Sequence, residues 1–404
     1  MIERNKLLKK NISLGALYKV LGMVLSYISI PFVLDYLGDF NYGVWVTLFS
    51  IITWVYTFDI GVGNGLKIKL TAALSSNDNK SANEYISTAY GVIFVITLLF
   101  FCVGTLSVWS LNLSELLSIE FVSGKQLQLV LYISFLFVLS NFVIGLYKQI
   151  LFATHKSSLV GLSNVIYQSL VIVGVIVADR LSTQSLIVIA VVYGISNLIV
   201  GFLFSINIFI SNTSLIPNPM NVNLGKIRDI TGLGVEFFVI QMCVIVIFTT
   251  DNVIITKLLG PEFVTSYSLV AQLFNSFIVL WYVISAPLTP LFTDAYVNND
   301  IEWIKRTIIK LNKLFFIVCV FVAVAIIVAD RIINLWVGKA NNFPQYIFLL
   351  FGLFVIIRIY GDLYMSFLNS IGKLRLQLLL SIIGAIINIP LSFYFVKTIG
   401  LGSS

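Results

Sequence analysis

Residues 186–210 read LIVIAVVYGISNLIVGFLFSINIFI, a stretch without a charged side chain. A hydrocarbon core of roughly 30 Å is crossed by about 20 helical residues, so this stretch is long enough to span a membrane. Lipid offers the backbone no hydrogen-bond partners, and a helix satisfies its N–H and C=O groups internally. The stretch therefore predicts a transmembrane helix.

Similar stretches recur along the whole chain. Hydrophobic residues make up 59% of the 404 residues and charged residues only 11%. We therefore expect an all-α integral membrane protein with about eleven spans. The approximate ranges are 12–33, 41–60, 85–109, 127–150, 160–178, 186–210, 230–256, 265–292, 314–336, 344–368 and 375–396.

The second half repeats the first at an offset near 220 residues. LYKQILFATHK (146–156) aligns with LYMSFLNSIGK (363–373), Glu84-Tyr85-Ile86 with Glu302-Trp303-Ile304, and Leu37-Gly38 with Leu259-Gly260. Each match is short, but all three fall in the same order in both halves. A duplicated helical membrane protein without extramembrane domains is more often a transporter than an enzyme.

The segment SNTSLIPNPMNVNLGKIRD (211–229) is rich in turn-forming and polar residues and predicts a linker. It divides the chain into an N-terminal bundle (1–210) and a C-terminal bundle (230–404). A counterpart of the sixth span would fall near 403–427, beyond Ser404. We therefore expect two pseudo-symmetric six-helix bundles with the twelfth span missing from this chain. The alternative is an eleven-span protein with its C-terminus outside.

The basic residues predict the orientation. Most of the 25 Lys and Arg fall at the N-terminus or in every second loop after it. This asymmetry places the N-terminus in the cytoplasm of a cell-membrane protein. It also explains the net charge of +7 without a nucleic-acid partner.

Features of a catalytic or metal site are scarce. Cys102, Cys243 and Cys319 lie in three separate spans, so they predict neither a disulfide framework nor a zinc site. His155, the one histidine, falls in a short inward loop. No loop is long enough for a soluble catalytic domain. We therefore expect no enzyme activity, no metal and no cofactor.

Six ionisable residues fall inside the predicted spans, where charge is costly and usually faces a bundle interior or cavity. Arg358 lies near the middle of the tenth span, and Asp362 follows on the same helical face. One interpretation is a structural ion pair. The other is an anion-binding guanidinium in a cavity, oriented by Asp362. Lys19 either extends toward cytoplasmic headgroups or supplies a second cationic contact.

The remaining three are carboxyl groups. Asp251 and Glu236 lie in the seventh span, and Asp59 closes the second span before a glycine-rich run. Each is a candidate for ion coupling, because a carboxyl in low dielectric can cycle between protonation states. The alternatives are local partners for Asp251 and proximity to headgroups for Glu236. The glycine-rich run follows a helix without a Lys-Ser/Thr pair, so we interpret it as a hinge rather than a phosphate loop.

Uncharged polar and aromatic residues also occur in the spans. We interpret the Asn and Gln side chains mostly as contacts between helices, with some available to line a hydrated path for a sugar. We interpret most of the tryptophans as interfacial belt residues. The tryptophans considered are Trp45, Trp54, Trp109, Trp281 and Trp336.

Four segments together resemble one known family. They are IPFVLDYLGDFNYGVW (30–45), FDIGVGNGLKIKL (58–70) with EYISTAY (84–90), DNVIITKLLG (251–260) with Tyr267, and YMSFLNSIGKLRLQ (364–377). The likeness is to bacterial oligosaccharide-lipid flippases of the Wzx type, in the multidrug/oligosaccharidyl-lipid/polysaccharide exporter superfamily. The resemblance implies two six-helix bundles around a central cavity. We hypothesise alternating access about a site near the bilayer midplane, with a carboxyl, Asp251 or Asp362 by preference, coupling the movement to an ion gradient.

The implied substrate is a polyprenyl-pyrophosphate-linked oligosaccharide, moved from the inner to the outer leaflet for O-antigen or capsule synthesis. Expected partners are membrane lipids, a polysaccharide polymerase and a chain-length regulator, with the protein itself a monomer. The first alternative is a multidrug or small-molecule cation antiporter of the same superfamily. Further alternatives are a membrane glycan polymerase, ligase or acyltransferase, and a structural scaffold.

Overall fold

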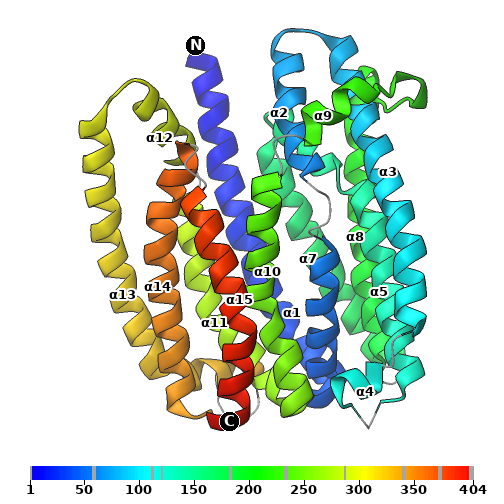
Figure 1. Cartoon of the computed structure of the whole chain (residues 1–404), viewed down its shortest axis with the longest axis vertical. Coiled ribbons are helices and arrows are strands. Elements are labelled where there is room, and N and C mark those ends of the chain that lie inside the picture. The colour runs from blue at the N-terminus through cyan, green and yellow to red at the C-terminus, as the bar shows by residue number, and fades with distance from the viewer. Residues whose placement is uncertain are drawn as a thin grey trace.

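The fold is built from helices packed side by side (Figure 1). The computed structural model describes residues 2–56, 61–110, 113–119, 122–181, 184–231, 235–285, 288–338, 343–371 and 375–399, and every regular element in them is helical. The long helices are α1 (Ile2–Tyr56), α3 (Asn79–Ser110), α5 (Gly124–Ile144), α7 (Ser157–Leu181), α8 (Leu186–Ser211), α10 (Val235–Leu258), α11 (Pro261–Ser285), α13 (Ile301–Val337), α14 (Gln345–Ser370) and α15 (Arg375–Ile399). The short ones are α2 (Val62–Ser75), α4 (Leu113–Leu117), α6 (Tyr147–Ala153), α9 (Ile227–Thr231), α12 (Leu288–Val297), η1 (Thr213–Leu215), η2 (Pro219–Asn221) and η3 (Leu224–Lys226).

The helix α1 reverses direction at Gly38. The backbone there has φ 73° and ψ 165°, a non-helical conformation that glycine adopts at little cost. In the described residues, ten helices are long and apolar enough to cross a membrane, and the first of them, Ser13–Val55, contains this turn. Because that helix crosses twice, the ten helices make eleven crossings, as predicted. The start of α1 and the end of α15 accordingly lie at opposite ends of the molecule (Figure 1).

The two halves of the chain form two bundles, with α3 on one flank and α13 on the other (Figure 1). The predicted repeat is visible in the backbone. Gly38 and Gly260, which the sequence aligns, both have positive φ values, 73° and 116°. Each lies at the turn between the first two crossings of its half. Glu84 and Glu302, also aligned, both lie in the first two turns of a flanking helix.

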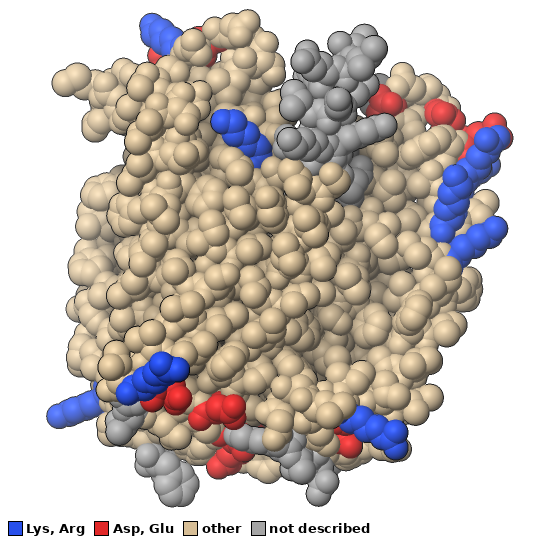
Figure 2. All heavy atoms as spheres, turned by 180° about the vertical axis from the view of Figure 1, so that it is seen from behind, with Lys and Arg blue, Asp and Glu red and all other residues tan. Residues whose placement is uncertain are grey.

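The outer helices expose apolar side chains. On α3, Phe94, Leu98 and Leu99 are 60%, 52% and 61% exposed. Charged residues gather toward the two ends of the face shown in Figure 2, and the band between them carries none. This distribution matches a surface that lies in hydrocarbon, where helices satisfy their own backbone groups and side chains need not be polar.

The predicted linker consists of the short helices η1, η2, η3 and the start of α9, and it is hydrogen-bonded to α3. The Asn83 side-chain amide donates hydrogen bonds to the carbonyls of Ser214 and Ile216, each at 2.8 Å. Glu84 forms an ion pair with Lys226, whose Nζ lies 2.9 Å from Glu84 Oε2. The linker therefore rests on the N-terminal half of the chain.

The predicted fourth span lies within Gly124–Ala153, one continuous candidate membrane helix that comprises α5 and α6. The eighth span ends earlier, since α11 stops at Ser285. The ninth span begins earlier than predicted, since α13 starts at Ile301 and one buried face continues along it.

Candidate functional site

The described residues line an open cavity of about 970 Å³ between the two bundles. Its walls come from both legs of α1 and from α7, α8, α10, α11, α14 and α15. The lining residues are Ser26, Ser29, Ile30, Val33, Tyr42, Trp45, Val46, Phe49, Ser50, Gln168, Tyr193, Ile247, Phe248, Asp251, Asn252, Tyr267, Ser268, Ala271, Gln272, Asn275, Ile278, Tyr346, Ile347, Leu350, Phe351, Phe354, Arg358 and Asn388. The flanking helices α3, α5 and α13 contribute none of them.

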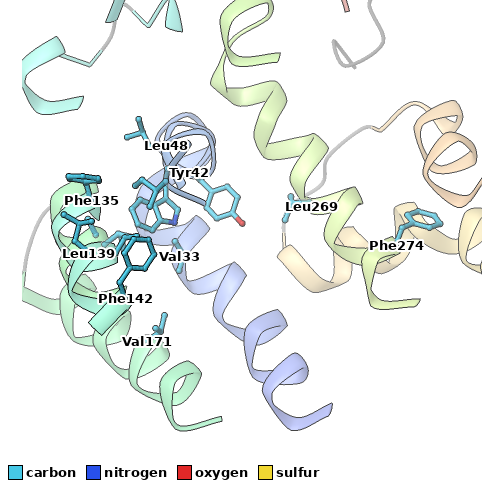
Figure 3. Packing of buried hydrophobic residues seen from close by; sticks show 14 of the residues in the cluster. Val33, Tyr42, Leu48, Phe135, Leu139, Phe142, Val171, Leu269 and Phe274 are labelled. Atoms are coloured by element: carbon cyan, nitrogen blue, oxygen red, sulfur yellow. The ribbon is translucent and has the colours of Figure 1, made fainter. Parts of the chain in front are cut away.

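Aromatic rings dominate both walls. On the N-terminal side Trp45 and Tyr193 lie with ring centroids 5.3 Å apart. On the C-terminal side Phe248 and Phe354 form an edge-to-face pair at 5.8 Å. Figure 3 shows Tyr42 pointing from α1 toward α11, away from the apolar side chains that pack between α1 and α5. Such rings offer flat apolar faces with hydroxyl and amide groups between them.

Arg358 is held by three side chains at the cavity wall. Its Nε donates to Asp362 Oδ2 at 3.2 Å, and Tyr282 donates to the same oxygen at 2.9 Å. One Nη donates to the Tyr282 hydroxyl at 3.4 Å. The guanidinium carbon lies 4.3 Å from the centroid of the Phe248 ring. Arg358 lines the cavity while Asp362 and Tyr282 do not, so the pair places positive charge toward the cavity.

Among the described residues that line the cavity, Asp251 is the one with a carboxylate side chain. Its Oδ1 accepts a hydrogen bond from Ser392 at 2.9 Å, and its Oδ2 accepts one from Tyr267 at 3.1 Å. The adjacent Asn252 donates to Ser50 Oγ on α1 at 2.8 Å. The Oδ1 of Asn252 is buried without a hydrogen-bond partner among the described residues.

The other predicted charges lie elsewhere. Lys19 is exposed on α1, about two helical turns before Ser26, and is not among the lining residues. Asp59 lies outside the described residues. Glu236 falls on α10, but its side chain also lies outside the described part of the chain.

The two bundles meet along a polar seam between the second leg of α1 and α10. Thr47 Oγ1 and Thr256 Oγ1 are 2.5 Å apart, and Trp54 Nε1 donates to Thr249 Oγ1 at 2.5 Å. Together with the Ser50–Asn252 hydrogen bond, these contacts recur at helical spacing on both helices.

The seam continues to the turn of α1. An added Cβ on Gly43 would overlap the carbonyl of Pro261 at the start of α11. Thr265 donates to the Asp39 carbonyl at 2.6 Å. The bundles are therefore in close contact at the Gly38 end of the molecule.

The sequence interpretation missed several lining residues. Trp45 lines the cavity and is 5% exposed, and Trp281 is 1% exposed, so neither of these two tryptophans belongs to the interfacial belt expected for most of them. Tyr193 and Asn252 were not singled out, because nothing in an apolar run marks which face points inward. Of the polar residues considered, Gln168, Gln272, Asn275 and Asn388 line the cavity.

Comparison with known proteins gives the following matches. Residues 8–295 match the family model described as polysaccharide biosynthesis protein, and residues 237–394 match the model described as MatE. A Yersinia pseudotuberculosis protein named for O-antigen export is 24% identical, over 88% of this chain and 82% of the relative. A Salmonella typhimurium protein named as an O-antigen transporter is 23% identical, over 95% of this chain and 89% of the relative.

Solved structures share the fold. An inward-facing multidrug resistance MATE family transporter of the MOP superfamily superposes with a TM-score of 0.78 at 15% identity, covering 96% of this chain and 92% of that chain. An outward-facing MATE family transporter gives a TM-score of 0.71 at 14% identity, covering 98% and 92%.

The seam predicts a specific cross-link. In a chain with Cys102, Cys243 and Cys319 replaced by Ala, Thr47→Cys with Thr256→Cys should oxidise to a disulfide, because the two side chains already touch. Mass spectrometry of the digested protein measures the linked peptides. Thr53→Cys with Thr256→Cys, on the same two helices, should stay reduced. Absence of the first linkage, or equal linkage in both pairs, would contradict the contact.

Proposed function

Because this chain belongs to the family of polysaccharide biosynthesis proteins, we propose that it is a flippase for surface polysaccharide synthesis. The observation that carries the proposal is the family match over residues 8–295. Relatives named for O-antigen export and transport support it. The family and the shared transporter fold indicate a transporter rather than an enzyme.

The proposed substrate is a polyprenyl-pyrophosphate-linked oligosaccharide. Its sugars would enter the cavity, where aromatic rings offer stacking surfaces and side chains such as Gln168 and Asn275 offer hydrogen bonds. The polyprenyl chain is as apolar as the bilayer and would remain in it. Movement of the two bundles about the cavity would then expose the sugars to each side in turn.

Arg358 is the proposed contact for the pyrophosphate. A guanidinium presents planar donors that suit phosphate oxygens, and Asp362 and Tyr282 hold it at the wall. Lys19 lies on the same leg of α1 as the lining residues Ser26 and Ser29, nearer the N-terminus. We propose it as an approach contact rather than a cavity contact.

The proposed orientation places the N-terminus in the cytoplasm of the cell membrane, from the distribution of Lys and Arg. The closed seam at the Gly38 end then lies on the outer side, and the cavity belongs to an inward-facing state. The better superposition on the inward-facing transporter supports this assignment.

The proposed moving units are the N-terminal bundle (1–210) and the C-terminal bundle (230–404). The linker (211–229) would move with the first, since it is hydrogen-bonded to α3. A monomer is sufficient for this arrangement. The further partners proposed are a polysaccharide polymerase and a chain-length regulator.

A strain deleted for this gene tests the proposed function. We expect loss of surface polysaccharide and accumulation of the completed lipid-linked oligosaccharide, because the unit is built inside and cannot cross. Extraction of membrane lipids followed by mass spectrometry measures the accumulation. Normal polysaccharide without accumulation, in a strain with no second flippase, would favour a small-molecule antiporter instead.

Arg358→Ala in that strain should lower export roughly tenfold or more, the loss expected for a charge-assisted hydrogen bond. Arg180→Ala, which removes an exposed guanidinium at the end of α7, is the matched control and should export normally. Membrane levels of both variants are measured by immunoblot. Normal export by Arg358→Ala would remove this residue from the site.

Asp251 is the proposed ion-coupling group, with Glu236 and Asp59 as further candidates. Asp251→Asn keeps the side-chain shape but removes the charge, so export should no longer respond to an ion gradient. The readout is the export rate before and after a protonophore or a sodium ionophore. A wild-type rate unaffected by both ionophores would reject gradient coupling.

A further inference from the structure

Helix α13 packs against its neighbours through a single face along its whole length. Ile304, Leu311, Phe315, Val322 and Ala329 are all buried, at the spacing of one helical stripe. The opposite face of the helix is therefore exposed from its first turn to its last.

After Lys313 this exposed face carries no charged side chain until Asp330. Phe316, Ile317, Val320 and Phe321 are 67%, 52%, 64% and 62% exposed. A continuous exposed apolar face of this kind lies against lipid chains. The hydrocarbon boundary on this flank therefore falls between Lys313 and Phe316.

On the N-terminal side of that boundary the same face carries four basic side chains, with Ile309, 55% exposed, among them. Lys305, Arg306, Lys310 and Lys313 are all exposed. At 100° per residue they fall within about 140° of one another around the helix axis. Arg306 is paired with Glu302, whereas the three lysines have no acidic partner among the described residues. Figure 2 shows Lys and Arg gathered on the flank that α13 forms.

The opposite flank carries a single exposed lysine on α3, Lys80, which lies near the carboxylate of Glu84. At the start of α3, Lys226 is paired with Glu84 at 2.9 Å and lies 4.2 Å above the ring of Tyr85. Its charge is thus partly buried and neutralised within the protein. The unpaired basic face is therefore a feature of α13 and not of every helix at this end.

The basic face is held in a fixed direction. Asp300 caps α13 by accepting a hydrogen bond from the Trp303 N–H at 3.0 Å. The Trp303 ring packs on Phe292 of α12 at 5.8 Å, and Phe292 packs on Phe367 of α14 at 5.4 Å. This anchoring directs the lysines outward at the edge of the hydrocarbon.

We propose that Lys305, Lys310 and Lys313 bind the phosphate headgroups of anionic phospholipids. The face meets the lipid-exposed surface without a break, so a headgroup bound here can keep its acyl chains against Phe316 and Val320. Basic clusters at a membrane boundary attract anionic lipids in this way. A soluble anion would gain no contact from the apolar part of the face. The binding is independent of the flippase function proposed above.

The test compares lipid binding by the purified full chain in detergent. Phosphatidylglycerol or phosphatidylcholine is added, and native mass spectrometry counts the lipids retained. The variant carries Lys305→Gln, Lys310→Gln and Lys313→Gln. The matched control carries Lys80→Gln, Lys156→Gln and Arg228→Gln, which remove three exposed cations elsewhere. A third protein carries Lys→Arg at the same three positions of α13.

Wild type, the matched control and the Lys→Arg protein should prefer phosphatidylglycerol. The α13 Gln variant should lose at least tenfold in phosphatidylglycerol affinity, since each lysine near an anionic surface contributes about fivefold, and should keep its phosphatidylcholine binding. Equal losses in the α13 variant and the matched control would overturn the proposal. So would displacement of the lipid by inorganic phosphate at equal concentration, or a dimer that the α13 substitutions dissociate.

Discussion

Backbone hydrogen bonding is the constraint on which the rest of this structure depends. In hydrocarbon an unpaired N–H or C=O costs several kcal/mol, so each crossing must be a helix. The non-helical turn at Gly38 agrees with this rule, because it comes at the end of a crossing rather than within one. Once every crossing is a helix, side chains can be polar only where helices face one another. The cavity, with Asp251, Asn252 and Arg358 on its walls, lies in that position.

The contact between the bundles follows from the same rule. Apolar packing alone gives little preference for one helix neighbour over another in lipid, so association relies on close approach and hydrogen bonds. The seam uses both: Gly43 allows α1 to reach the backbone of Pro261, and Thr47 and Thr256 bond across it. In the movement proposed above, the hydrogen bonds of the seam would be exchanged for hydrogen bonds to water.

Sequence patterns predicted the number of crossings, the repeat and the pairing of Arg358 with Asp362, because these depend on length and helical spacing within one segment. Contacts between helices could not be predicted this way. Tyr282 and Phe248 reach Arg358 from α11 and α10, and their positions depend on how each helix is rotated. Trp45 illustrates the same limit. Composition favours tryptophan at the headgroups, but the glycine two residues earlier draws this segment into the interface between the bundles.

The pairing of Arg358 also bears on how the proposed pyrophosphate substrate would be released. A lone guanidinium inside a membrane protein is costly, and Asp362 and Tyr282 offset that cost. The same contacts occupy the Nε and one Nη, and Asp362 cancels part of the field that an anion in the cavity would experience. As the proposed pyrophosphate contact, Arg358 would thus bind more weakly than an unpaired arginine. Weaker binding would help a flippase, because a substrate held by an unpaired charge would dissociate slowly. The aromatic and amide groups of the cavity, which carry no net charge, can then supply selectivity without making release slow.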